Sequence, residues 1–171
     1  MIIQPVLPIF FVDELRFSYT EMMIAISVCK GIGYAASSPL WVRLFKQLPI
    51  FQFSFLVALL AFCFPLILIG AKWQFLLCYV AYIGYGLMQS GSELSWHLSP
   101  ASFSRQKESL PFSETNILAV GLRGCVIPFL GSLLFYLFNS VAVMVAGSLF
   151  CLLGSLVLIN YKEDEKAPEA I

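Results

Sequence analysis

The longest stretch without a charged side chain constrains this sequence more than any other feature. It runs for 38 residues between Arg123 and Lys162, and uncharged stretches of 25 and 20 residues lie on either side of Lys72. A helix needs about 20 apolar residues to cross the hydrocarbon core of a bilayer. The long stretch is therefore sufficient for two crossings, and Asn139-Ser140 provides a polar turn near its middle.

The composition agrees with a chain that is embedded in lipid. Charged residues make up 12% of it and hydrophobic residues 60%, whereas about a quarter of the residues in a soluble domain are charged. Backbone polar groups find no partner in the bilayer core, so membrane spans are either helices or closed barrels. The apolar stretches lack the alternation of barrel strands, and we therefore expect an all-α integral membrane protein.

We expect a single transmembrane domain over residues 1–161 and a solvated cytoplasmic tail over residues 162–171. The first apolar segment, at about residues 2–12, contains Pro5 and Pro8 and is too short to cross. It resembles the last half of a helix whose beginning lies upstream. The predicted fold is a bundle of five full transmembrane helices plus this truncated first helix. The full spans are predicted at about residues 19–41, 49–70, 73–98, 115–138 and 140–161.

The basic residues outside the spans predict the orientation of the chain. One side has Arg16 and Lys72, and the other has six basic residues: Arg43, Lys46, Arg105, Lys107, Lys162 and Lys166. Cytoplasmic loops carry the excess of Lys and Arg. We therefore expect a multi-pass membrane protein with a cytoplasmic C-terminus. Four aromatic residues near span ends are expected to anchor the protein at the membrane surface: Trp41, Trp73, Trp96 and Tyr161.

Ionisable side chains inside the predicted spans are the candidate functional residues. A charge at the centre of a span costs about 2.5–3.5 kcal/mol on insertion scales, so such residues usually face a protein interior or a wet cavity. Lys30 and Tyr34 share one face of the second span, Glu93 and His97 share a face of the fourth, and Arg123 lies in the fifth. The third and sixth spans carry no charge, and we expect them to face lipid.

Each of these residues has two interpretations. Glu93 and Arg123 lie at similar depths on consecutive helices and can form an ion pair; Arg123 is then either a packing residue or a contact for a substrate or gate. Lys30 has no evident carboxylate partner, which makes it either a cavity residue or a structural one. His97 is either an interfacial residue or part of a proton relay with Glu93.

The sequence contains no set of residues that is typical of an enzyme. Phosphate-binding, nucleophile-elbow and HExxH motifs are absent, the chain has one histidine, and its aspartates are Asp13 and Asp164, outside the spans. The five cysteines lie in apolar stretches without a CxxC pair. We therefore expect no catalysis, no metal and no cofactor, and the zero net charge gives no reason to expect nucleic acid as a partner.

Three segments resemble the C-terminal half of a major facilitator superfamily transporter, its seventh to twelfth helices. Residues 5–14, with 17–20 after them, are similar to the outer end of the seventh helix and its turn. Residues 38–47 (SPLWVRLFKQ) resemble the loop between the eighth and ninth helices, and residues 121–131 (GLRGCVIPFLG) resemble an eleventh helix. The resemblance covers nearly the whole chain.

This resemblance implies that the seventh, eighth, tenth and eleventh helices line a cavity while the ninth and twelfth are peripheral. It places Lys30, Tyr34, Glu93 and Arg123 along the substrate path, and it makes Arg43 and Lys46 candidates for a gating loop. The family's loop motif has Gly and Asp where this chain has Val42 and Lys46, so the acidic residue of that gate is absent here.

The resemblance implies secondary transport of a small solute by alternating access between two six-helix halves in a bacterial inner (plasma) membrane, with this chain as a C-terminal half or a truncated transporter. The expected partners are the lipid bilayer, an unknown small solute, and either a separate N-terminal six-helix half or a homo-oligomer. The alternative is a non-transporting membrane subunit, or a decayed transporter fragment, that only packs with partner membrane proteins.

Overall fold

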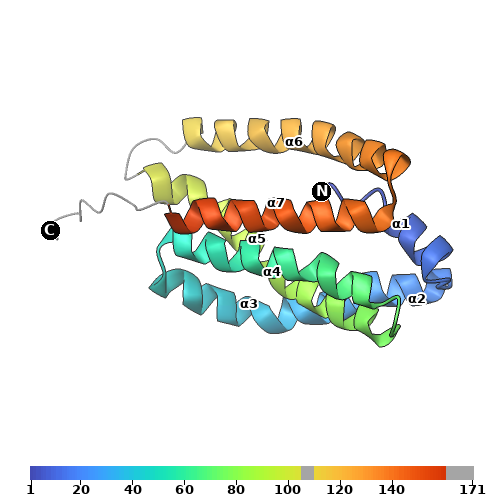
Figure 1. Cartoon of the computed structure of the whole chain (residues 1–171). Helices are drawn as coiled ribbons and strands as arrows, with labels where there is room; N and C mark the ends of the chain where they lie inside the picture. The colour runs from blue at the N-terminus through green and yellow to red at the C-terminus, as the bar shows by residue number, and fades with distance from the viewer. Residues whose placement is uncertain (105–109, 161–171) are drawn as a thin grey trace, which may run out of the picture.

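The computed structural model describes residues 1–104 and 110–160, which form helices joined by short turns (Figure 1). The expected all-α class is therefore confirmed for these residues. The predicted tail at 162–171, Tyr161 and residues 105–109 of the predicted cytoplasmic loop lie outside the described residues. So do four of the basic residues on which the predicted orientation depends: Arg105, Lys107, Lys162 and Lys166.

The first residues form turns that lead into two short helices, α1 (Leu7–Ile9) and η1 (Phe10–Glu14), the latter a π-helical turn. Pro8 lies in the first turn of α1, where its missing N–H leaves no helical hydrogen bond unmade. Phe10 and Phe11 are completely buried, so this short segment is anchored in the core by its aromatic side chains.

A continuous helical run follows, composed of α2 (Tyr19–Met23), η2 (Ile24–Cys29) and α3 (Lys30–Gln47). Ser18 and Glu21 begin it with a reciprocal capping box. The run ends at Leu48, which is extended because it precedes Pro49. Residues 38–47, which resemble an inter-helix loop in sequence, are therefore helical.

Four longer helices complete the chain: α4 (Ile50–Gly70), α5 (Leu76–Ser104), α6 (Leu110–Leu137) and α7 (Ser140–Asn160). Three of them are long and apolar enough to cross a membrane, namely α4, residues 113–137 of α6 and residues 140–158 of α7. The side chain of Asn139 caps α7 by accepting a 2.7 Å hydrogen bond from the Ala142 N–H.

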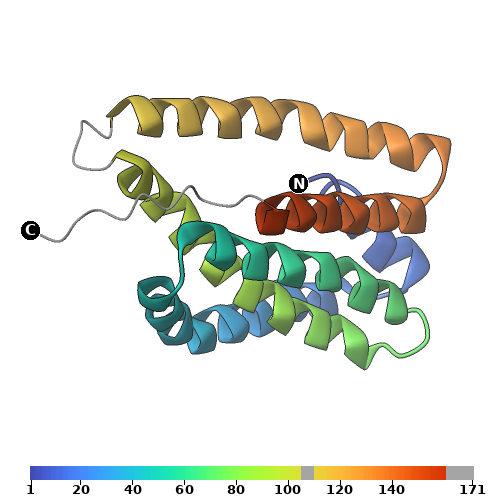
Figure 2. The same ribbon diagram turned by 60° about the vertical axis from the view of Figure 1, so that its left-hand side comes forward.

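The helices pack in the order α3, α5, α4, α7, and each neighbouring pair in that series has an extensive contact. Figures 1 and 2 show α6 beside this group and separated from it along most of its length. The main core joins side chains from the N-terminal segment and these helices; its largest fully buried members are Phe10, Phe11, Leu68, Met144, Val6 and Val143.

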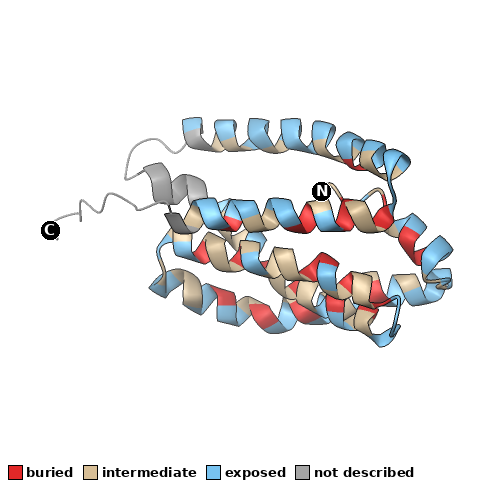
Figure 3. Cartoon of the chain, viewed as in Figure 1, coloured by how far each residue is buried: buried red, intermediate tan, exposed pale blue. Residues whose placement is uncertain are grey.

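The distribution of burial corrects one expectation from the sequence. The uncharged helices α4 and α7 were expected to face lipid, yet 28% of the apolar stretch in each is buried, against 6% in α6 (Figure 3). The two helices are buried for different reasons: α4 buries large side chains such as Phe53 and Leu68, whereas α7 packs closely because of small residues. Ser148 and Gly147 are buried on α7, and such small residues let apolar helices approach one another closely. Absence of charge is thus a poor guide to which face of a helix is peripheral.

Candidate functional site

The candidate site lies where α3 and α5 touch, and two glycines make that contact possible. A methyl group on Gly86 would overlap the backbone of Lys30 and Tyr34, and one on Gly33 would overlap the backbone of Ile83. The two helices therefore approach backbone to backbone, as small residues permit in membrane bundles. This close approach brings the polar faces of two separate predicted spans together.

A hydrogen-bonded cluster joins the two helices within two turns of the glycine contact. The Tyr34 hydroxyl donates a 2.7 Å hydrogen bond to Glu93 Oε2, and Gln89 Nε2 donates a 2.8 Å hydrogen bond to Glu93 Oε1. Both carboxylate oxygens thus have a donor, which offsets part of the cost of placing this charge between helices. The sequence predicted Tyr34 and Glu93 as path residues, and the structure brings them into direct contact.

Gln89 was not singled out from the sequence, although its spacing of four residues from Glu93 is the signal that could have found it. Its Oε1 atom is buried and has no hydrogen-bond partner among the described residues. A hollow of about 330 Å³ borders the cluster, and Tyr34, Ser38, Glu93 and His97 are among its lining residues. Glu93 and His97 therefore face the same space, as the sequence predicted from their shared helix face.

Lys30 lies one turn before Tyr34 but lines a different cavity, of about 400 Å³. Its ammonium group lies 5.9 Å from the centroid of the Tyr85 ring, an attractive cation–π geometry. Among the described residues, no carboxylate lies within ion-pair distance of Lys30. The unpaired charge that the sequence indicated is thus present, and it is directed to a cavity.

The structure does not support the expected ion pair between Glu93 and Arg123. Instead, the Arg123 guanidinium lies over the Trp96 ring at 5.1 Å from its centroid, and Asn116 Nδ2 donates a 3.5 Å hydrogen bond to the Trp96 carbonyl. Glu93 already has both of its oxygens occupied by nearer donors. Arg123 therefore lies apart from the other candidate residues, and its contact with Trp96 joins α6 to α5.

The two gating-loop candidates and the expected anchor Trp41 all lie near the end of α3. Arg43 and Lys46 are exposed on its last turns, where a positive charge favours the helix C-terminus. Trp41 was expected at the membrane surface, but this was wrong: it is 3% exposed and its Nε1 donates a 2.7 Å hydrogen bond to the Leu87 carbonyl. Gly91 provides the space for its ring.

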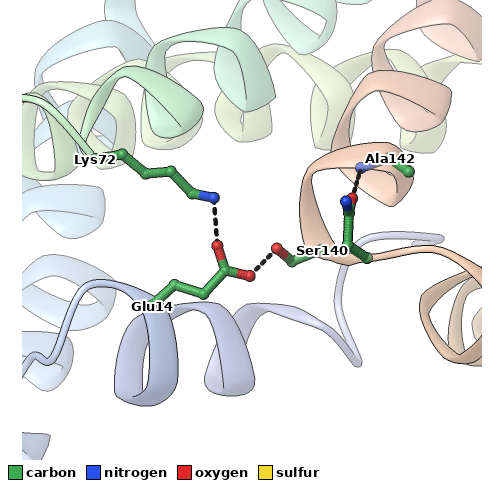
Figure 4. Close-up of polar contacts among 5 residues, drawn as sticks. Glu14, Lys72, Ser140 and Ala142 are labelled. Atoms are coloured by element: carbon green, nitrogen blue, oxygen red, sulfur yellow. Dashed lines mark hydrogen bonds and ion pairs between the residues drawn. The ribbon is translucent and has the colours of Figure 1, made fainter.

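A second polar cluster, which we term the Glu14 clamp, was missed in the sequence (Figure 4). Glu14 forms a 2.5 Å ion pair with Lys72 and accepts a hydrogen bond from the hydroxyl of Ser140, which is 1% exposed. The clamp joins η1, the turn after α4 and the start of α7. Its members are far apart in the sequence, and no helical spacing connects them, so no local signal could have found it.

Comparisons with known proteins add nothing to this geometry. No protein family, curated protein or solved structure matches this chain.

Proposed function

We propose that this chain is a C-terminal half, or truncated form, of a major facilitator type transporter that moves a small solute by alternating access. One observation carries the proposal. Tyr34 and Glu93 are hydrogen-bonded at the α3–α5 contact of a mainly apolar bundle, and Lys30 lies one turn before Tyr34 and lines a neighbouring cavity. Intramembrane ionisable groups are costly, and they are typical of substrate and ion pathways.

In this mechanism the polar face of α3 and α5 forms one wall of the path, and an N-terminal six-helix half forms the other. The close glycine contact makes α3 and α5 move as one unit, and rocking of one half against the other exposes the solute to each side in turn. The resident membrane is the bacterial inner membrane, with the C-terminus in the cytoplasm. The proposed protein uses no cofactor and catalyses no reaction.

The test is solute uptake in membrane vesicles from cells that carry the gene at its native locus. Vesicles with and without the gene are compared over a panel of labelled sugars, amino acids and organic acids, and an epitope tag after Ile171 reports the amount and size of the protein. We expect Glu93→Gln to reduce uptake of the dependent solute at least tenfold. Glu114→Gln, on an exposed position of α6, is the matched control and should retain uptake. If no solute depends on the gene, the transport proposal fails.

One observation favours the alternative of a non-transporting membrane subunit. The apolar stretch of α6 is only 6% buried, and its exposed face carries large side chains such as Ile117 and Phe129. Such a face suits packing against another membrane protein or lipid. A stable complex isolated from native membranes, together with unchanged uptake of every solute on deletion, would establish this alternative.

A further inference from the structure

The Lys30 cavity has the dimensions and lining of a ligand site. Its volume is about 400 Å³, within the range of about 300–1,000 Å³ that is usual for small-molecule pockets. Side chains from the N-terminal segment, η2, α3, α4, α5 and α7 contribute to its wall. The apolar wall with few polar groups is also the usual character of such pockets.

The charge in the cavity indicates the sign of the ligand. Among the described residues that line the cavity, Lys30 is the one lysine or arginine, Met1 with its α-amino group belongs to the same wall, and neither Asp nor Glu is present. Glu93, the nearest acidic candidate on α5, is already hydrogen-bonded to Tyr34 and Gln89. A lysine in apolar surroundings without a counter-ion is stabilised by a bound anion.

A second, independent group points to the same kind of ligand. Tyr82 also lines the cavity, and no hydrogen bond joins its hydroxyl to another described residue. A tyrosine hydroxyl in a cavity wall can donate one hydrogen bond to a ligand. One ammonium and one hydroxyl suffice to match the two oxygens of a carboxylate.

The aromatic side chains indicate what the rest of the ligand is. The Phe64 ring centroid lies 5.5 Å from that of Tyr82 and 4.7 Å from that of Tyr85, and Met22 and Met88 also line the cavity. Aromatic rings and polarisable methionines in the wall favour a flat apolar body.

We infer that this cavity binds a small monocarboxylate with an aromatic body, held by Lys30 and Tyr82. The inference goes beyond the proposed function, because this cavity lies within the helix bundle and not between the bundle and a second half. The bound ligand lies one turn from Tyr34, in a cavity distinct from the hollow that borders the Tyr34–Glu93 contact.

The experiment is direct binding of radiolabelled 4-phenylbutyrate to the purified full chain in nanodiscs of zwitterionic lipid, with empty nanodiscs as background. Unlabelled 4-phenylbutyrate, 4-phenylbutyramide and 4-phenylbutylamine are the competitors. They share one aromatic body and differ in the charge of the head group, so they test whether the cavity requires an anion. We expect only the acid to compete. Equal competition by the amide would overturn the inference because it would show a merely apolar cavity, and so would binding no higher than in empty nanodiscs.

Two variants assign the contacts. Lys30→Met should weaken binding by about tenfold or more, and Tyr82→Phe by about threefold to tenfold, since each removes one hydrogen bond to a charged ligand. Tyr136→Phe is the matched control, because Tyr136 is 85% exposed on α6. Unchanged binding in Lys30→Met overturns the assignment, and the ligand series in the unmodified chain decides the question if either variant does not fold.

Failure of this inference and failure of the transport proposal give different results. If 4-phenylbutyrate binds through Lys30 but deleting the gene changes no uptake, then the site is correct and the transport function is wrong. If another solute depends on the gene while 4-phenylbutyrate does not bind, the chain is a transporter and this ligand class is wrong.

Discussion

At the scale of single residues, the surroundings of the Glu93 carboxylate are set by two side chains that donate hydrogen bonds to it. Tyr34 reaches it from a different helix, while Gln89 reaches it from the preceding turn of the same helix. The tyrosine hydroxyl therefore both stabilises the charge and connects α3 to α5. Removal of the hydroxyl leaves a half-buried carboxylate with one donor fewer, which is costly in surroundings of low dielectric constant.

We accordingly expect Tyr34→Phe to lower the free energy of unfolding by about 1 kcal/mol. The measurement is thermal or denaturant unfolding in a mild detergent. Tyr136→Phe, which removes a hydroxyl from an exposed ring, should leave stability unchanged. Equal effects of the two substitutions would mean that the Tyr34–Glu93 hydrogen bond contributes nothing to stability.

At the scale of helices, the glycines of α3 and α5 fall into two groups: some lie where the helices touch and others have open space beside them. Gly33 and Gly86 lie against the backbone of the opposite helix, whereas Gly31 and Gly84, two residues away in each helix, have no atom near the position of an added methyl group. The same two helices therefore contain both a test position and its control.

We expect Gly86→Ala to destabilise the protein by about 2 kcal/mol or more, because the added methyl group forces α3 and α5 apart. Gly84→Ala should be neutral or stabilise by up to about 1 kcal/mol through helix propensity. The free energy of unfolding is measured for both variants. Spin labels on α3 and α5 report the distance between the two helices. Similar destabilisation in both variants would show that propensity or folding yield, rather than the close contact, governs the outcome.

The helix scale also shows how far sequence reasoning reaches. Lys30 and Tyr34, and likewise Glu93 and His97, were correctly expected to share faces, because helical spacing fixes relations within one helix. Relations between helices were not predictable in this way. Trp41 is buried because Gly91 on α5 leaves room for its ring, and Arg123 contacts Trp96 rather than Glu93 because α6 lies away from the α3–α5 contact. These outcomes depend on which helices become neighbours.

At the scale of the whole molecule, the proposed orientation places the turn after α4 outside the cell. Trp73 in this turn is 84% exposed, so a cysteine at that position would be accessible to reagents. Gln47 is the last residue of α3 and lies just before the start of α4, at the other end of α4 from Trp73. It is also exposed, and the proposed orientation places it on the cytoplasmic side.

We expect Trp73→Cys, in a chain whose five native cysteines are replaced by alanine, to react with a membrane-impermeant maleimide in intact cells with a permeable outer membrane. Gln47→Cys should react only after the inner membrane is opened. The reverse labelling pattern would show that the C-terminus is outside. If neither cysteine reacts even after the inner membrane is opened, both positions are covered by protein.

The Glu14 clamp has a consequence for how the protein is made. Glu14 and Ser140 are 126 residues apart in the chain, and synthesis proceeds at about 5–20 residues per second. The serine partner of Glu14 is therefore made roughly 6–25 s after Glu14 itself. Until then Phe10 and Phe11 lack the Val143 and Met144 side chains that complete their core. A chain that ends before α7 is thus expected to be less stable than the finished protein.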